Sequence, residues 1–329
     1  MILVTGGAGF IGGNYLWHLY RENYHRKVAV IDKLTYASNL EYIQPLIDKK
    51  FVLFHEEDIG NSPGVKELFK HYRPNHIVNF AAETHVDNSI QSFLPFVNTN
   101  VIGTINLLQC CRDLKYLNKF IHVSTDEVYG SLELNSQDKF TEETQYEPNS
   151  PYSASKAASD HFVNAWRVTY GVPTIITNCS NNYGPAQHNE KFIAKVIENA
   201  LNDKPIPIYG TGDNVRDWLY VDDHCHAINL VLKNGRVGQK YNIGGGTELS
   251  NLELVKKILD MMEKPHTLIK FVDDRLGHDK RYAIDYGKIE NTLKYKPSHS
   301  LEKGLKKTIE WIKRDRKSTR LNSSHTDIS

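Results

Sequence analysis

Short apolar runs alternate with longer amphipathic stretches through the first half of the chain. The runs are rich in Val, Ile and Phe and predict buried strands at 2–5, 28–32, 51–55, 76–80, 120–125 and 174–179. Stretches with helical spacing lie between them, near 11–22, 62–72, 93–114 and 152–170. Near-continuous apolar strands that alternate with helices predict a doubly wound α/β fold, in which helices cover both faces of a parallel sheet.

This rhythm loosens after Cys179. Short strands mix with helices from there on, at 206–208, 240–243 and 268–272 for the strands and near 190–202, 222–233, 250–262 and 299–314 for the helices. We therefore expect a larger domain at 1–180 and a smaller mixed α/β lobe at 181–315 that completes a cleft, with the chain able to cross between them. Residues 316–329 are rich in Ser and Thr with almost no apolar face, so we expect a non-native or disordered tail.

The charge balance is even, with 40 Lys and Arg against 39 Asp and Glu, so no global field favours nucleic acid or a membrane as partner. No apolar run reaches the ~18 residues of a membrane span, and the chain opens on a strand rather than on a targeting peptide. The four cysteines show no CxxC spacing, which predicts a reduced, cytoplasmic protein. We expect no metal site, since His85 has no second ligand at a suitable spacing.

A glycine-rich loop, GGAGFIG, follows the first strand and opens a helix. Gly6, Gly9 and Gly12 allow a tight turn and close backbone approach to a pyrophosphate, and the helix N-terminus supplies unpaired N–H groups. Asp32 stands twenty residues beyond Gly12, where a carboxylate accepts hydrogen bonds from ribose hydroxyls and repels a 2′-phosphate. This context predicts that the first domain is of the Rossmann type and binds NAD, although Lys33 weakly favours NADP.

Tyr152 and Lys156 are spaced i, i+4 at the start of a helix introduced by Pro151, so they share one helical face. An ammonium beside a phenol favours the phenolate, and we expect Lys156 to lower the pKa of Tyr152 from about 10 towards neutrality. Such a tyrosine can take a proton from a sugar hydroxyl as hydride leaves for nicotinamide. The Tyr-x-x-x-Lys pattern is common on helix surfaces, and it gains this meaning only from the NAD loop upstream.

Two neighbouring acids, Asp126 and Glu127, stand where the strand at 120–125 should end. Successive side chains of a strand point to opposite faces. Both acids can therefore serve one site only if the strand gives way to a loop at Asp126. A solvated pair of loop acids is the plain alternative.

These residues belong to motifs by which the chain resembles the extended short-chain dehydrogenase/reductase family and, within it, the nucleotide-sugar 4,6-dehydratases. The motifs run in order through GGAGFIG, DKLTYASN, NFAAETHVDNSI, TNVIGT, HVSTDEVYG, SPYSASKAASDHF, TNCSNNYGP, YGTGDNVRDWLYVDD, YNIGGG and GHDKRYAID. The Thr-Asp-Glu signature is specific, because the related sugar epimerases carry small or hydroxyl residues at the positions of Asp126 and Glu127.

The resemblance implies a lyase that dehydrates dTDP-glucose to dTDP-4-dehydro-6-deoxy-glucose in deoxysugar synthesis, for example of rhamnose. Tyr152, with Lys156 and Thr125, would serve the oxidation of C4 by NAD. Glu127 would remove the C5 proton, and Asp126 would protonate the departing C6 hydroxyl before hydride returns to C6. Asp126 must then stay protonated near neutrality, which requires burial, a hydrogen bond or its acidic neighbour to raise its pKa.

The resemblance also implies contact positions. Those for NAD are Gly6, Gly9, Phe10, Ile11, Gly12, Asp32, Lys33, Leu34, Thr35, Asp58, Ile59, Ala81, Ala82, Thr99, Tyr152, Lys156 and Asn182. Those for the nucleotide sugar are Thr84, Thr125, Asn181, Lys191, Phe192, Pro207, Tyr209, Arg216, Asn251, Asp274, Arg275 and His278. The guanidinium of Arg216 suits phosphate oxygens, unless it forms a surface ion pair with Asp213 or Asp217.

A homodimer is the assembly that the resemblance implies, because family members pair through the helices near 93–114 and 152–170. The first of these carries an apolar pattern that includes Val97, Val101, Ile105 and Leu108. The same residues could instead cover the sheet.

Departures from the family pattern leave the nucleotide open. Asn88 stands where Arg is usual, His188-Asn189 replace an apolar-Pro pair, and Leu276 replaces Pro. We expect dTDP-glucose, with UDP- or CDP-glucose as the alternative. A nucleotide-sugar 4-epimerase would need the tyrosine and NAD but no acid pair, and a catalytically silent NAD-binding protein would have lost part of the Thr, Tyr and Lys set.

Overall fold

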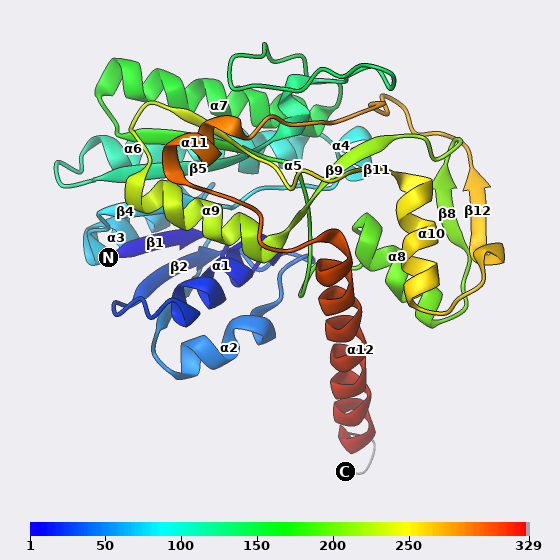
Figure 1. The fold of residues 1–329 in the computed structure, drawn as a ribbon. Coiled ribbons are helices and arrows are strands. Elements are labelled where there is room, and N and C mark those ends of the chain that lie inside the picture. The colour runs from blue at the N-terminus through cyan, green and yellow to red at the C-terminus, as the bar shows by residue number, and fades with distance from the viewer. Residues whose placement is uncertain (327–329) are drawn as a thin grey trace.

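The computed structural model describes the backbone of residues 1–326 and the side chains of residues 1–316. A seven-stranded sheet, parallel throughout, forms the larger part, in the order β10-β6-β5-β4-β1-β2-β3 (Figure 1). Its strands are β1 (Ile2–Thr5), β2 (Val28–Asp32), β3 (Val52–Glu56), β4 (His76–Asn79), β5 (Lys119–Thr125), β6 (Thr174–Cys179) and β10 (Lys240–Ile243). The predicted doubly wound fold is confirmed.

Helices cover both faces of this sheet, which explains why its strands are apolar almost without interruption. On one face Ile2 and Val4 pack against α1 (Phe10–Arg21), α2 (Leu40–Asp48), α9 (Val221–Asn234) and α11 (Gly287–Leu293). On the other face Leu3 and Ala29 pack against α3 (Ser62–Tyr72), α6 (Thr104–Arg112) and α7 (Pro151–Tyr170). Neighbouring strand residues thus enter opposite layers of the core.

A second core holds the smaller part together. It lies between α8 (Phe192–Leu201), α10 (Asn251–Met261) and α12 (Leu301–Thr326), and Ile197, Ile258 and Leu305 are among its buried residues. β8 (Ile206–Tyr209) pairs with β12 (Ile269–Val272), and β9 (Val215–Tyr220) lies between β7 (Asn181–Tyr183) and β11 (Glu248–Ser250). Figure 1 shows α8, α10, β8 and β12 grouped beside the large sheet.

The chain crosses back into the larger part after residue 180. The predicted strand at 240–243 is β10, which pairs with β6 at the edge of the main sheet, and α9 packs on α1. The expected lobe at 181–315 allowed the chain to cross between the two parts, and β10 is such a crossing. A short apolar strand carries no local sign of which sheet it joins, because the partner strand decides that.

The expected helix at 93–114 is instead three consecutive segments. They are α5 (Leu94–Phe96), a π-helical stretch η1 (Val97–Gly103) and α6, and they follow a short helix, α4 (Val86–Gln91). The π-helical stretch turns Asn100 inward, where its side chain accepts from Glu83 N (2.8 Å) and donates to Ser155 Oγ (2.8 Å). Such local widening of a helix often accompanies a functional site.

The last helix, α12, continues to Thr326, beyond the predicted end near 314. Arg316 donates to Asn202 Oδ1 (2.6 Å) and lies 3.7 Å from Glu198 Oε2, so it contacts α8. The remainder of the expected tail, with its side chains from residue 317 and its last residues 327–329, lies outside the described residues.

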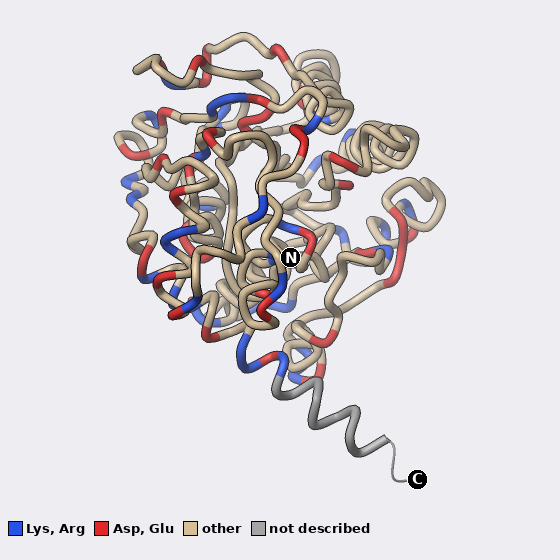
Figure 2. The backbone as a smooth tube through the Cα atoms, turned by 90° about the vertical axis from the view of Figure 1, so that its right-hand side faces the viewer, with Lys and Arg blue, Asp and Glu red and all other residues tan. Residues whose placement is uncertain are grey.

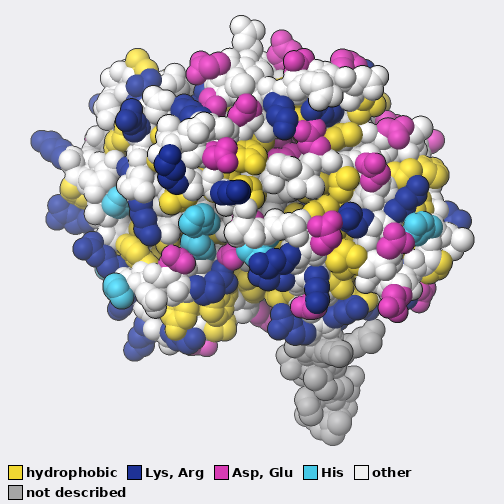
Figure 3. Space-filling view, viewed as in Figure 1, with side chains coloured by type: hydrophobic (Ala, Val, Ile, Leu, Met, Phe, Trp, Pro, Cys, Tyr) yellow, Lys and Arg dark blue, Asp and Glu magenta, His cyan; other side chains and the backbone are white. Residues whose placement is uncertain are grey.

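Charged residues of both signs are interspersed along the backbone and over the surface (Figures 2 and 3). No helix within the described part of the chain has the length and apolar character that crossing a membrane requires.

Candidate active site

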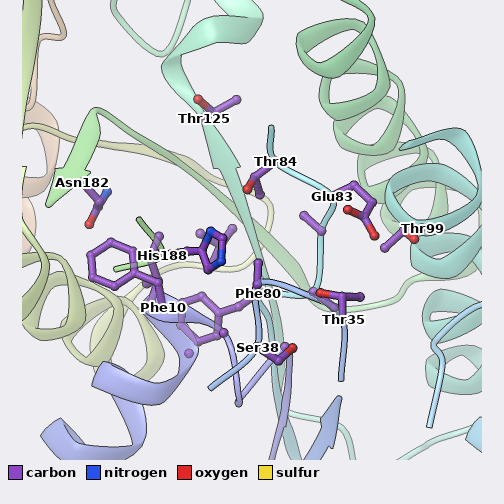
Figure 4. A pocket seen from close by; sticks show the side chains of 18 of the residues that line it. Phe10, Thr35, Ser38, Phe80, Glu83, Thr84, Thr99, Thr125, Asn182 and His188 are labelled. Carbon is purple, nitrogen blue, oxygen red and sulfur yellow. The ribbon is translucent and has the colours of Figure 1, made fainter. Parts of the chain in front are cut away.

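A cavity of about 270 Å³ opens at the carboxyl ends of the central strands (Figure 4). Gly6, Asp32, Ala81 and Thr125 reach it directly from the ends of β1, β2, β4 and β5. The strand order reverses between β1 and β4, and ligands of doubly wound sheets bind at such a reversal. The position of the cavity follows from the topology of the sheet.

The glycine loop forms one wall of the cavity. Gly6 has φ +69°, and a Cβ there would lie 2.6 Å from Ala81 N. A Cβ on Gly12 would lie 2.2 Å from Gly6 O. No side chain caps the N-terminus of α1, so the N–H groups of its first turn remain for a ligand. The loop therefore suits a pyrophosphate, which needs close backbone approach and N–H donors.

Asp32 fixes the neighbouring loop. Its Oδ2 accepts from Ala8 N (2.9 Å), and its Oδ1 accepts from Leu34 N (2.9 Å) and Ser38 Oγ (3.0 Å). The carboxylate lies between the glycine loop and the loop after β2, where the ribose of a dinucleotide would meet it.

Lys33 is tied to acids rather than solvated. Its Nζ donates to Thr99 Oγ1 (2.8 Å) and lies 3.2 Å from Glu83 Oε1 and 3.9 Å from Asp58 Oδ2. Figure 4 shows Glu83 and Thr99 beside each other on one wall of the cavity. These carboxylates neutralise the ammonium, which removes its attraction for a 2′-phosphate.

The strand β5 ends at Thr125, and a 3₁₀ turn, η2 (Asp126–Tyr129), follows it. Thr125 Oγ1 caps this turn by accepting from Glu127 N (3.3 Å). The expectation that the strand gives way at Asp126 is confirmed. Both acids line the cavity, which excludes the alternative of two solvated loop acids.

Burial raises the pKa of both acids. For Asp126 the shift is large, because the carboxylates of Glu127 and Asp217 add to burial, against a weaker opposing effect of Arg216. For Glu127 burial is opposed by the positive charges of Arg216, Lys191 and Arg275. The site therefore holds one acid that is strongly favoured as the neutral carboxyl, beside a second whose charge is better supported.

Tyr152 reaches the cavity from the first turn of α7. Pro151 starts this helix, and Ser150 and Ser153 form a capping box around the tyrosine. Burial first, and then the charge of Glu127, raises the pKa of Tyr152 well above its usual value, while a contact with the Thr125 hydroxyl acts in the opposite direction. The expected lowering of the Tyr152 pKa by Lys156 is wrong for the polypeptide by itself, because burial of the phenol dominates, and the Lys156 ammonium donates to Val123 O (2.8 Å).

Most predicted residues meet in this cavity. All of the catalytic candidates line it, with every NAD contact except Leu34. Of the nucleotide-sugar contacts, Thr84, Thr125, Asn181 and Lys191 also line it. The others lie outside it, and they are Phe192, Pro207, Tyr209, Arg216, Asn251, Asp274, Arg275 and His278.

Three of those outside residues gather around Asp87 of α4. Arg275 Nη1 lies 3.5 Å from Asp87 Oδ1, Tyr209 OH donates to Asp87 Oδ2 (3.4 Å), and the Tyr209 ring packs edge-on against His278. Asp274 Oδ1 accepts from His278 Nδ1 (2.7 Å). These contacts join Asp87 of α4 to residues of the smaller part.

Arg216 and its neighbours serve the frame of the site. Its guanidinium is buried, donates to the carbonyls of Asp279 (3.0 Å) and Val215 (2.8 Å), and lies over the Tyr282 ring. This arrangement contradicts the alternative of a surface ion pair with Asp213 or Asp217. Other outside residues are also held in the fold, since Phe192 stacks on Trp218.

Two departures from the family pattern, Asn88 and His188, both contact Tyr36, and His188 also lines the cavity. Asn88 Nδ2 donates to Tyr36 OH (3.2 Å), and Tyr36 OH donates to Glu190 Oε1 (3.3 Å). His188 packs edge-on against Tyr36 and lies 3.8 Å from Glu190 Oε2. Figure 4 places His188 between Phe10 and Thr84. Both substituted side chains therefore contact Tyr36 rather than each other.

Several lining residues were not predicted. They include Ser38, Phe80, Glu83, Ser124, Cys179, Ser180, Gln187 and Glu190. Asp217 was predicted only as a partner of Arg216, yet its buried carboxylate accepts from Thr247 N (2.8 Å) and Gly245 N (2.9 Å) and acts on Asp126. Glu83 lies within the motif NFAAETHVDNSI and Ser124 within HVSTDEVYG. Their position next to predicted site residues could have identified them as lining residues.

This fold, with a dinucleotide cavity at the carboxyl edge of the sheet and a tyrosine and lysine on α7, is that of an extended short-chain dehydrogenase/reductase. Residues 3–308 match the family model described as GDP-mannose 4,6 dehydratase, and the chain belongs to that family.

Known members of the family resemble the chain over nearly its full length. A dTDP-glucose 4,6-dehydratase of Salmonella typhimurium is 48% identical over 94% of this chain and 92% of its own. A dTDP-glucose 4,6-dehydratase of Streptomyces venezuelae, a double mutant solved with NAD bound, is 44% identical with a TM-score of 0.92, over 96% of this chain and 98% of that one. A UDP-glucuronic acid 4-epimerase of Bacillus cereus, solved with UDP-glucuronic acid and NAD, is 31% identical with a TM-score of 0.89. The match covers 95% of this chain and 99% of that one.

Proposed function

We propose that the chain is an NAD-dependent dTDP-glucose 4,6-dehydratase, which converts dTDP-glucose to dTDP-4-dehydro-6-deoxy-glucose. The observation that carries the proposal is the pair Asp126 and Glu127 in one cavity with Tyr152. Elimination of water across C5 and C6 needs a base and an acid that are one carbon apart, and adjacent residues on a tight turn supply such a pair. The similarity to relatives named for this reaction supports the same substrate.

The residues present fit NAD. The glycine loop offers N–H groups to the pyrophosphate, Asp32 faces the ribose, and the acids around Lys33 disfavour a 2′-phosphate. When bound, NAD supplies a reversible hydride acceptor for the carbon at C4. We infer that the cofactor half of the cavity extends from Gly9 to Tyr152.

Tyr152 takes the proton from the C4 hydroxyl in this proposal. Its phenol must first lose its own proton, and positive charge nearby favours that loss. Lys156 stands one helical turn along α7 and is the chain's own source of such charge. The hydroxyl of Thr125 contacts the phenol and also favours its ionised form. The ketone formed at C4 makes the neighbouring C5 hydrogen acidic.

Glu127 then removes the C5 proton, and Asp126 donates a proton to the C6 hydroxyl so that it leaves as water. The strongly raised pKa of Asp126 suits a proton donor, and the three positive groups around Glu127 suit a base that starts as a carboxylate. A 4-epimerase keeps the tyrosine and NAD but has no use for this pair, which is why we prefer dehydration.

The test is to incubate the purified protein separately with dTDP-, UDP- and CDP-glucose and to identify the products by mass spectrometry. We expect loss of one water from dTDP-glucose with no net consumption of NAD. A product of unchanged mass with C4 inverted would identify an epimerase. Turnover confined to UDP- or CDP-glucose would keep the reaction and overturn the nucleotide.

The NAD part of the proposal has a matched pair of variants. Gly6 and Gly171 share a positive φ, +69° and +71°, but a Cβ on Gly171 meets nothing within 4 Å. Both alanine variants strain the backbone, whereas only Gly6→Ala pushes against Ala81 beside the pyrophosphate. We expect Gly6→Ala alone to lose co-purifying NAD, measured by absorbance after denaturation. Equal NAD content in both variants would contradict the assignment.

We also propose a homodimer and a place in deoxysugar biosynthesis, where the product is a precursor of sugars such as rhamnose. Exposed apolar side chains at the start of α5, on η1 and on α7 support the dimer, namely Phe93, Leu94, Val97, Ile102, Phe162 and Val168. Leu108, expected in this pattern, is instead buried against the sheet. Light scattering should give a dimer that Leu94→Asp dissociates and the control Val237→Asp does not. A monomeric wild type would contradict the dimer.

A further inference from the structure

A third ionisable residue continues the line of Tyr152 and Lys156 along α7. Asp160 follows Lys156 by four residues, so the three side chains lie on one face of the helix, one turn apart. α7 packs on β5 and β6 (Figure 1). All three side chains are buried, with 7%, 3% and 2% of their surface exposed in chain order.

The ammonium of Lys156 lacks direct charge compensation. Its Nζ donates to the neutral carbonyl of Val123 (2.8 Å), and among the described residues no carboxylate oxygen lies within ion-pair distance of it. A buried ammonium is costly unless negative charge is near. Burial lowers the pKa of Lys156, and the carboxylate of Asp160 is the largest influence that raises it again.

Asp160 is held by donors that stabilise a carboxylate. Its Oδ2 accepts from Ser124 Oγ (2.8 Å), Tyr146 OH (2.9 Å) and Asn178 Nδ2 (3.4 Å), and its Oδ1 lies 3.4 Å from His122 Nε2. Neutral donors of this kind favour the negative charge without cancelling it. The charge therefore remains available to act on Lys156 through the low-dielectric interior.

We propose that Asp160 is a positioning residue that acts through Lys156, supplying the buried negative charge that keeps the Lys156 ammonium protonated beside Tyr152. The inference rests on the proposed function. The carboxylate touches neither the cavity nor the reacting atoms, because Ser124 and Val123 of β5 stand between. The titratable groups that face Lys156 and Asp160 are Tyr152 on α7, His122 on β5, Cys179 on β6, Lys240 on β10, and Tyr129 and Tyr146 from the segment between β5 and α7.

The matched variants are Asp160→Asn, which removes the charge, and Tyr146→Phe, which removes one donor to the same carboxylate and keeps the charge. Without the carboxylate the pKa of Lys156 falls, so the ammonium deprotonates at lower pH. We expect the basic limb of the kcat/KM profile against pH to move down by about one unit in Asp160→Asn, roughly a tenfold loss on that limb. Tyr146→Phe should leave the limb in place, and Asp160→Glu should restore it.

An unshifted limb in Asp160→Asn, or equal shifts in Asp160→Asn and Tyr146→Phe, would overturn the proposal and leave Asp160 a structural residue. If Asp160→Asn does not fold, the wild type decides. NMR titration of ¹⁵N-lysine-labelled NAD-loaded protein, with Lys156→Met to assign the signal, should show a charged ammonium at pH 7, and a neutral amine there would refute the inference. That charge state is measurable even if the protein does not turn over dTDP-glucose, which separates this inference from the proposed function.

Discussion

Asp126 and Glu127 are adjacent in the chain, yet their surroundings differ. Asp126 is 1% exposed, and its Oδ2 has no hydrogen-bond partner among the described residues. Two carboxylates, those of Glu127 and Asp217, raise the pKa of Asp126 further, whereas the positive charges of Arg216, Lys191 and Arg275 oppose the rise in the pKa of Glu127. Two groups whose pKa values are pushed apart can act as acid and base at one pH. This difference supports the roles proposed for them.

The raised pKa of Asp126 predicts a pH-dependent cost in stability. The folded protein keeps a proton that the unfolded chain releases, so this group's contribution to stability is fully present below the unfolded value, about 4, and is lost as the pH rises towards the folded value. An amide cannot ionise. We therefore expect the Tm of Asp126→Asn to exceed that of the wild type by more at about pH 8 than at about pH 5. A Tm difference that does not change with pH would contradict this.

At the scale of elements, short turns and caps place the reacting groups. The 3₁₀ turn η2 aims both acids into the cavity, and the capping box at the start of α7 fixes Tyr152. The sequence predicted β5 and α7 because their apolar patterns and Pro151 are local signals. It missed β7, whose residues Asn181 and Asn182 are polar, since that strand depends on pairing with the distant β9.

Two capping boxes allow stability and activity to be separated. Ser150 caps α7 next to Tyr152, and Ser250 caps α10 away from the acids. Each alanine variant should lose ~0.5–2 kcal/mol in urea unfolding. Only Ser150→Ala should also lower kcat, because its helix start carries the tyrosine. An equal loss of kcat in both variants would show that the position of Tyr152 does not depend on its cap.

At the scale of the whole molecule, the cofactor half of the site was predictable and much of the substrate half was not. The carboxyl ends of parallel strands meet at one edge of the sheet, so Gly6, Asp32 and Thr125 come together there whatever the conformation of the loops. The opposite wall depends on long connections, so Glu190 gave no periodic signal, and the predicted Arg275 and His278 lie beyond the cavity. The pairing of β10 with the main sheet was also not predictable, because the sheet that a short strand joins depends on long-range tertiary contacts.

The C-terminal end provides a test at this scale. Arg316 contacts α8 through Asn202 and Glu198, so a truncation should retain it. Removal of residues 317–329 should leave activity and Tm unchanged, since that segment has almost no apolar periodicity with which to dock. Thermal unfolding with the dehydration assay measures both. A Tm that drops by several degrees would mean that this segment stabilises the fold.

A 6-fluoro analogue of dTDP-glucose tests whether Asp126 and Glu127 divide the elimination between them as acid and base. Fluoride leaves without protonation, so the analogue does not need the acid. With dTDP-glucose, Asp126→Asn and Glu127→Gln should each lose ~10²–10⁴-fold in rate.

With the analogue, Asp126→Asn should recover most of its rate, and Glu127→Gln should not, because the C5 proton still has to be removed. Stopped-flow measurement of fluoride release in both variants, with Tyr152→Phe as a control that stalls earlier, gives the comparison. Recovery of Glu127→Gln alone would reverse the two roles, and recovery of neither variant would contradict the division of labour at the end of β5.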